Sequence, residues 1–170
     1  MIRKLTILLA SILIMASLVI AAVKPDFNGE WTMDRARSFG LPGNMQQTMT
    51  VKQTADQMEV ETKLIQPSNE RIIKDTYIFD GKEYAFTPPS PPNAPPNAPA
   101  PTGKRITKWL PDGNGILATE VTTTQTPNGV VTTNIMKKWT FTADGELTIA
   151  MFVDNSQISY EAKRIFTRKK

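Results

Sequence analysis

Residues 130–153 read VVTTNIMKKWTFTADGELTIAMFV and contain the pattern that decides the fold. Before the Asp144-Gly145 pair, apolar or Thr side chains occupy every second position, with one interruption at Lys137. The alternation resumes after the pair at Leu147, Ile149, Met151 and Val153. A period of two is typical of a half-buried strand, and Asp-Gly supplies the positive φ angles of a tight turn. We therefore predict an antiparallel hairpin here.

The same pattern extends outward through most of the chain. Turn signals rich in Gly, Pro, Asn and Asp separate short alternating segments. The predicted strands are Gly29–Met33, Gln47–Thr54, Gln57–Ile65, Arg71–Phe79, Glu83–Phe86, Arg105–Leu110, Ile116–Thr124, Val130–Thr142, Glu146–Val153 and Gln157–Thr167. Short connections between long strands favour an antiparallel meander. The expected fold class is all-β, a single up-and-down β-barrel of about ten strands.

One segment does not fit a sheet. Residues 87–102 read TPPSPPNAPPNAPAPT, and proline cannot donate a backbone hydrogen bond to a neighbouring strand. We predict an extended, polyproline-like loop over residues 88–101. It is either a semi-rigid excursion between two strands or a segment that a partner recognises. The first interpretation is favoured because no aromatic or basic residue lies inside the segment.

The N-terminal residues 1–22 have the layout of a secretory signal peptide. Arg3 and Lys4 precede an almost continuously apolar run from Leu5 to Ile20, and Ala21-Ala22 follows it. We expect cleavage there, which leaves residues 23–170 as the barrel domain of an exported protein, periplasmic or secreted. The alternative is an uncleaved membrane anchor, because the run is near the lower limit for a spanning helix.

Composition excludes several classes of chemistry. The sequence has no Cys and no His, which rules out disulfides, thiol nucleophiles, Ser-His-Asp hydrolases and the usual zinc or haem sites. Without Arg3 and Lys4, 18 basic residues face 16 acidic ones. This near balance lacks the concentrated positive field that nucleic-acid binding needs. We expect one domain and a monomer that uses no cofactor or metal.

Two carboxylates are candidates for a role inside the barrel. Asp75 and Glu120 lie in step with apolar neighbours on their strands, so both are predicted to point inward. A buried carboxylate needs a partner, and pairing with Lys or Arg could orient a ligand. The other interpretation is that the predicted register is off by one residue. An enzyme that uses these carboxylates is a third and weaker hypothesis.

Aromatic side chains flank the Pro-rich loop in sequence. If they share one mouth of the barrel, they form an apolar ligand pocket beneath the loop. The alternative is that they are ordinary core residues. The set consists of Tyr77, Phe79, Tyr84, Phe86 and Trp109.

Three short motifs resemble exported bacterial lipocalin-like proteins. They are Phe27–Ser38 with its Gly-x-Trp, the hairpin Asp80–Tyr84, and the closing Arg164–Arg168. The resemblance implies a calycin-type barrel in which a first-strand Trp closes one end and a terminal-strand Arg packs across it. Here that structural end plug would be Trp31 with Arg168, or with Arg164 if the register differs. The Pro-rich insert is a departure from the group.

These observations predict a non-enzymatic, exported lipocalin-like protein that binds a small apolar or amphipathic molecule. The alternative is a structural or interaction module of the cell envelope, with a filled barrel and a Pro-rich contact loop. Either way we expect no nucleic-acid partner, and membrane contact only through the N-terminal segment if it stays uncleaved.

Overall fold

The structure is a computed structural model that describes residues 24–40, 44–67, 69–90, 97–126 and 129–169. It is all-β, and the predicted strands are all present. Their bounds are β1 Gly29–Met33, β2 Gln46–Gln53, β3 Gln57–Gln66, β4 Asn69–Ile78, β5 Asp80–Phe86, β6 Thr102–Trp109, β7 Gly115–Thr126, β8 Gly129–Phe141, β9 Leu147–Asn155 and β10 Ser159–Arg168. The signal peptide predicted over residues 1–22 lies outside the described residues.

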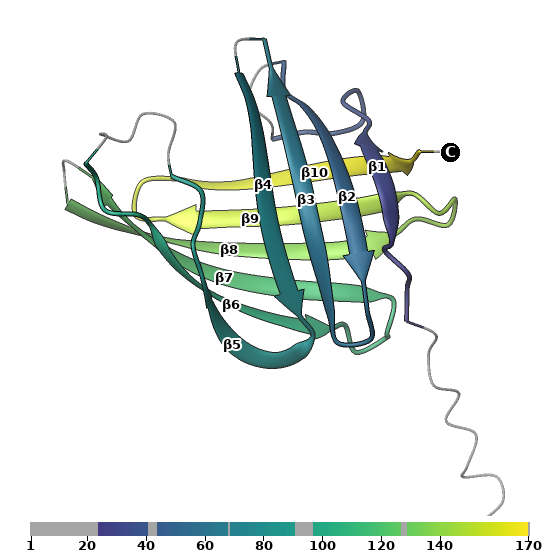
Figure 1. Cartoon of the computed structure of the whole chain (residues 1–170). Helices are drawn as coiled ribbons and strands as arrows, with labels where there is room; N and C mark the ends of the chain where they lie inside the picture. Colours follow the sequence, from purple (N-terminus) through teal and green to yellow (C-terminus); the bar gives the residue numbers. More distant parts are fainter. Residues whose placement is uncertain (1–23, 41–43, 68, 91–96, 127–128, 170) are drawn as a thin grey trace, which may run out of the picture.

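The strands form one antiparallel sheet that is nearly closed into a barrel. Neighbours follow the order β4-β3-β2-β1-β10-β9-β8-β7-β6-β5, so the first strand, β1, pairs with the last, β10. Figure 1 shows β2 to β4 crossing over β6 to β10 at a large angle. The sheet edges β4 and β5 do not pair, and this gap is where the barrel stays open. The predicted fold class, a single antiparallel β-barrel, is confirmed.

The hairpin of β8 and β9 shows why local sequence specifies this sheet. Trp139 pairs with Ile149 in register, and both side chains are buried. Gly145 adopts a φ of 77°, which a side chain would strain. The Thr142 amide donates to the Glu146 carbonyl at 2.9 Å and closes the turn. The alternation of apolar side chains and the Asp144-Gly145 turn therefore specify the hairpin together.

Alternate connections of an up-and-down barrel lie at the same end. We call the closed end the one formed by the turns β2–β3, β4–β5, β6–β7 and β8–β9 together with residues 24–28. Its interior is filled with buried side chains. Phe27 stacks on Phe141 with ring centroids 5.2 Å apart, and its carbonyl accepts from the Trp31 indole at 3.0 Å. The N-terminal segment thus plugs this end.

The opposite end, which we call the mouth, carries the connections β1–β2, β3–β4, β5–β6, β7–β8 and β9–β10. Its β5–β6 connection is the Pro-rich segment. Pro88 and Pro101 are buried where they leave and rejoin the sheet. The Ser90 carbonyl accepts from the Arg71 guanidinium of β4 at 2.9 Å. The described part of the segment therefore contacts the barrel on both sides of the gap.

Trp31 and Arg168 are partners across β1 and β10. The guanidinium carbon of Arg168 lies 4.7 Å from the centroid of the indole ring, which is 1% exposed. The same guanidinium donates to the Asp26 carbonyl at 3.1 Å. Arg168 rather than Arg164 therefore lies over the indole, and the end-plug role remains a prediction.

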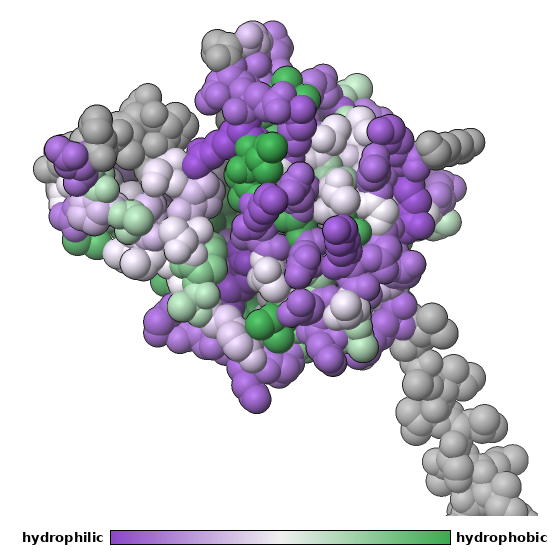
Figure 2. Space-filling view, in the orientation of Figure 1, coloured by the Kyte–Doolittle hydropathy of each residue, from purple (hydrophilic) through white to green (hydrophobic). Residues whose placement is uncertain are grey.

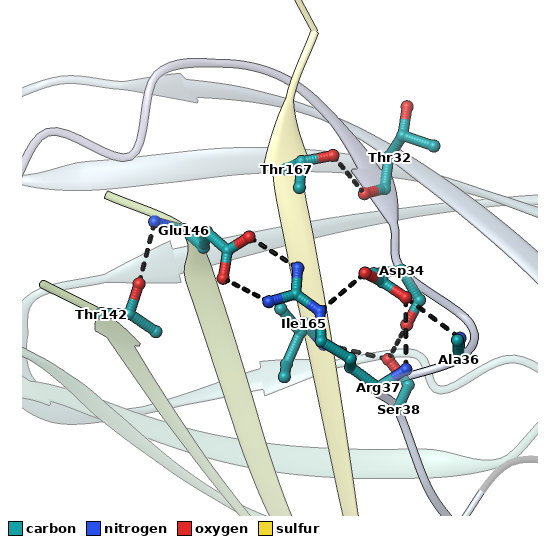
Figure 3. A network of polar contacts seen from close by, with 9 residues as sticks. All are labelled: Thr32, Asp34, Ala36, Arg37, Ser38, Thr142, Glu146, Ile165 and Thr167. Carbon is teal, nitrogen blue, oxygen red and sulfur yellow. Dashed lines mark hydrogen bonds and ion pairs between the residues drawn. The ribbon is translucent and has the colours of Figure 1, made fainter. Parts of the chain in front are cut away.

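A polar clasp fixes the chain that follows β1 (Figure 3). Arg37 donates to both Asp34 and Glu146, and the shortest of these contacts are 2.7 and 2.6 Å. The Ser38 hydroxyl donates to the Asp34 carbonyl and accepts from the Ile165 amide. The clasp joins this segment to β10 and to the β8–β9 turn. Its hydrogen bonds from Arg37 lower the pKa of Asp34.

Candidate functional site: a charged cluster in an apolar cavity

A cavity of about 340 Å³ lies between the closed-end core and the mouth. This volume is within the range of small-molecule sites, roughly 300–1,000 Å³. Its apolar lining comprises Met49, Val60, Leu64, Ile73, Ile135, Ile149, Met151 and Val153. Figure 2 shows the surface hollowed between the part that carries β5 with the Pro-rich segment and the part that carries β3 and β4.

Arg105 of β6 is the centre of a buried ion cluster at this cavity. Its Nε donates to Glu120 at 2.8 Å, and its terminal nitrogens donate to Asp75 at 2.6 Å and to the Thr76 carbonyl at 2.8 Å. Asp75 and Thr76 belong to β4, so Arg105 bridges the gap in the barrel. With only 4% of its surface exposed, the guanidinium is fully committed to these partners.

Two aromatic rings hold the guanidinium of Arg105 between them. Its central carbon lies 4.2 Å from the ring centroid of Tyr77 and 4.1 Å from that of Phe86. Stacking of this kind is attractive, and it is stronger when water is excluded. Burial raises the pKa of the Tyr77 hydroxyl, which therefore stays protonated. The rings thus fix the position of the cation.

Lys137 of β8 joins the cluster from the other side. Its Nζ donates to Glu120 at 2.8 Å, on the carboxylate oxygen that Arg105 also uses. Burial lowers the pKa of Lys137, but the neighbouring Tyr77 and Glu120 raise it, and the net direction is upward. Lys137 is therefore a cation inside the barrel.

Arg164 of β10 lines the same cavity but has no ion pair with any described residue. Its Nε is buried and has no hydrogen-bond partner in the described part of the chain. Burial lowers the pKa of Arg164 because it disfavours the charged form. Gln47 and Trp139 also line the cavity. The side-chain amide oxygen of Gln47 and the indole nitrogen of Trp139 are both buried without a hydrogen-bond partner among the described residues. Such groups are rare unless a ligand or water satisfies them.

The cavity therefore carries an excess of one positive charge. Three cations, Arg105, Lys137 and Arg164, line it together with two carboxylates, Asp75 and Glu120. Arg164 is partly buried and has no ion pair among the described residues, so an anion seated beside it would offset the cost of desolvating its charge. The chemistry of the lining suits a molecule that is mostly apolar and carries one negative group.

The structure separates the aromatic residues that the sequence grouped. Tyr77 and Phe86 line the cavity. Phe79 and Trp109 pack against each other in the closed-end core, with ring centroids 4.8 Å apart. Tyr84 is exposed on β5, where its hydroxyl donates to Asp80 at 2.7 Å.

The two carboxylates do face inward and pair with a basic residue, as their positions in the strands indicated. Sequence reasoning did not identify Arg105 or Gln47, and it named Arg164 only as an alternative partner of Trp31. A signal existed for Arg105, since it lies in step with the buried Thr107 of its strand. Lys137 had been noticed only as an interruption of an apolar face.

A second hollow, of about 430 Å³, lies on the outer faces of β2, β3 and β4. Exposed charged side chains dominate its lining, and Lys74 pairs there with Glu61 at 3.1 Å. Exposed ion pairs of this kind are well solvated, so they leave no charged group without a partner that a ligand would need to satisfy. The interior cavity is therefore the better candidate site.

Within the described ranges, no cluster of three or more His, Cys, Asp or Glu side chains could hold a metal ion. The described residues also include no helix long and apolar enough to cross a membrane.

Comparisons with known proteins reveal a similarity of shape only. No protein-family model matches the chain. No curated protein matches it either. Among solved structures, the crystal structure of secretory abundant heat soluble protein 4 from Ramazzottius varieornatus is similar, with a TM-score of 0.48 and 12% identity. The match covers 84% of this chain and 94% of that one.

Proposed function

We propose that this protein is a non-enzymatic binder of a small amphipathic molecule that carries one anionic group. The observation that supports this most strongly is Arg164, a cation in an apolar cavity with no partner among the described residues. The anionic group would bind at Arg164, and the Trp139 indole is close enough in register to donate as well. Both residues pair with Ile149 on β9 from opposite sides.

The remaining residues that line the cavity favour a ligand with an apolar tail. Leu64, Ile73, Ile135 and Val153 lie on the mouth side of Arg164 along their strands. Burying an alkyl chain among such side chains is favourable by about 0.8 kcal/mol for each CH₂ group. The tail would therefore extend from Arg164 toward the mouth.

A binding role fits the carboxylates better than catalysis does. Asp75 and Glu120 accept charge-assisted hydrogen bonds from Arg105, and Glu120 accepts one from Lys137 as well. A general acid or base must be placed to exchange a proton with a substrate, whereas these two side chains are engaged with Arg105 and Lys137. The rival envelope module required a filled barrel, and the cavity makes that hypothesis the weaker one.

Calorimetric titration tests the proposal with three ligands that share one tail length: decanoate, decanol and decyltrimethylammonium. We expect decanoate to bind most tightly. Arg164→Gln should weaken decanoate binding by about 10- to 100-fold, the usual value of hydrogen bonds to a charged group. Decanol binding should change little. Since Arg164 has no partner to lose, the variant should keep its melting temperature.

Arg168→Gln is the matched control, because Arg168 lies on the same strand but over Trp31 and away from the cavity. It should leave decanoate binding unchanged. Equal binding of all three ligands to the native chain would contradict the anionic selectivity. A complete absence of binding would contradict the proposed function itself.

We also propose that the chain is exported. Its support is the sequence of residues 1–22, which begins with Arg3 and Lys4 and continues as an apolar run. Mass spectrometry of the protein isolated from its native cell envelope or medium tests this. Loss of about 22 residues would support export with cleavage. A full-length mass in the cytosolic fraction would contradict it.

A further inference from the structure

A row of exposed apolar side chains, which we call the apolar stripe, crosses the outer wall of the barrel. Met136 of β8 pairs with Phe152 of β9, and their side chains are 44% and 41% exposed. Phe39 continues the stripe beyond β10, because it forms a bridge with Lys163 of that strand and is 52% exposed. The three apolar side chains line a shallow groove of about 390 Å³. Large apolar side chains that gather on an exposed face indicate an interaction surface.

Charged side chains flank the stripe, with basic groups on one side and acidic groups on the other. Lys138 of β8 and Lys163 of β10 lie at one level of the sheet, on the side of the closed end. On the side of the mouth, Asp154 lies two residues beyond Phe152, and Glu161 of β10 pairs with Phe152. Because alternate residues of a strand point to the same face, these charged side chains share the outer face with the stripe. On β10 the stripe therefore passes between Glu161 and Lys163.

We propose that the stripe is the contact between two copies of this chain, related by a two-fold axis that runs along it. Such an axis lies in the plane of contact and exchanges the two sides of the stripe. The basic side of one copy then meets the acidic side of the other. With strands about 4.8 Å apart and alternate residues about 6.6 Å apart, Lys138 lies opposite Asp154 of the partner subunit. The same geometry brings Lys163 near Glu161 of the partner subunit.

The apolar side chains lie close to this axis, so each would meet its own counterpart. Met136, Phe152 and Phe39 would form the centre of the contact, and the ion pairs would form its rim. An apolar centre with a polar rim is the usual anatomy of a protein interface. A different protein would need the same pattern of charges in reverse, whereas a second copy of this chain already carries it. Charge complementarity therefore favours self-association.

The proposed pair leaves both cavities open. Because the axis runs across the strands, the two barrels point in opposite directions, and neither mouth is covered. The inference is therefore independent of the proposed function. The stripe and its flanks extend about 14 Å across the strands and about 13 Å along them, less than the roughly 800 Å² that each partner buries in a standard interface. We expect a weak, reversible dimer with a Kd of about 10–500 µM, in place of the monomer expected from the sequence.

Sedimentation equilibrium of the full chain at increasing concentration, up to about 500 µM, measures this association. We expect the average mass to rise from that of a monomer toward that of a dimer. Phe152→Ser should weaken dimerisation by about tenfold or more, because the ring is buried once from each copy. Lys138→Glu and Asp154→Lys should each weaken it by about tenfold, since two ion pairs become two contacts between like charges.

An equimolar mixture of the Lys138→Glu and Asp154→Lys proteins gives a readout that a folding defect would not produce. In a mixed pair, positions 138 and 154 again carry opposite charges at both contacts. The mixture should therefore recover the association that each variant lacks alone. Lys52→Glu is the matched control, because it makes the same charge change at an exposed position of β2, which crosses over β8 to β10 on the other side of the barrel (Figure 1). It should leave dimerisation unchanged.

Three results would overturn the proposal. A chain that stays monomeric at every concentration would leave the stripe to a different partner. A dimer that persists in all three variants would form through another surface, such as the unpaired edges of β4 and β5. A mixture that stays monomeric would exclude the two-fold arrangement. Decanoate binding should be the same in Phe152→Ser as in the native chain, which separates a failure of association from a failure of the proposed function.

Discussion

Glu120 offers the sharpest test of the interior electrostatics. It is 3% exposed and accepts hydrogen bonds from Arg105 and Lys137, both at 2.8 Å. Glu120→Gln keeps the size of the side chain and removes its charge. Arg105 then keeps only Asp75, Lys137 loses its ion pair, and the positive excess in the cavity rises from one to two.

The expected loss in free energy of unfolding is about 3 kcal/mol. Removal of one partner from a buried ion pair typically costs about 3–5 kcal/mol, because the remaining charge stays buried without compensation. The lower end of that range applies here because Arg105 keeps Asp75 and the Thr76 carbonyl. Equilibrium urea unfolding, followed by tryptophan fluorescence, measures the change. Glu59→Gln on the exposed face of β3 is the control and should stay within about 0.5 kcal/mol.

A second variant separates charge imbalance from a packing defect. Glu120→Gln combined with Lys137→Met returns the positive excess to one and should recover most of the lost stability. Decanoate should also raise the melting temperature of Glu120→Gln more than that of the native chain, because the added positive charge favours an anion. A loss below about 1 kcal/mol for Glu120→Gln, or simple additivity in the double variant, would refute the reasoning.

Three further predictions concern the ends of the barrel. Trp31→Ala should lower the free energy of unfolding by about 3–5 kcal/mol, as large core truncations do, and a value near zero would exclude Trp31 as the end plug. Replacement of residues 88–101 by a short Gly linker should leave a cooperative melting transition but weaken decanoate binding, since Pro88 lines the cavity; loss of cooperativity would make the segment part of the core. Asp34→Asn should destabilise the protein at neutral pH. Arg37 lowers the pKa of Asp34 in the folded state from its usual 3.8. The contribution of ionised Asp34 to the free energy of unfolding is therefore present above pH 3.8 and is lost as the pH falls through the lowered pKa of the folded state. Melting curves of native and variant protein should therefore converge in acid, and a constant difference would contradict this origin.

The strands could be predicted because their signals are local. Alternation determines which face of a strand is buried, and Asp-Gly pairs such as Asp144-Gly145 determine where it turns. Most boundaries moved by one to three residues, as hydrogen bonding extended strands beyond their most regular part. The predicted inward direction of Asp75 and Glu120 followed from the same alternation, and their pairing with Arg105 confirms it.

Depth along the barrel axis could not be predicted in the same way. Tyr77 and Phe79 share one face of a predicted strand, yet Tyr77 lines the cavity and Phe79 lies in the closed-end core. Their depth depends on the stagger between strands that are distant in sequence. The position of Arg105 and Arg164 at the cavity was missed for another reason. Arginine is usually exposed, and only the partners brought by other strands show that one is satisfied and the other is not.

The levels of the side chains in the sheet define how a ligand would lie. Trp139, Ile149 and Arg164 occupy one level of three adjacent strands, and that level borders the filled core. An anionic group at Arg164 would therefore sit at the bottom of the cavity. The tail has apolar contacts only toward the mouth, so its free end would point there.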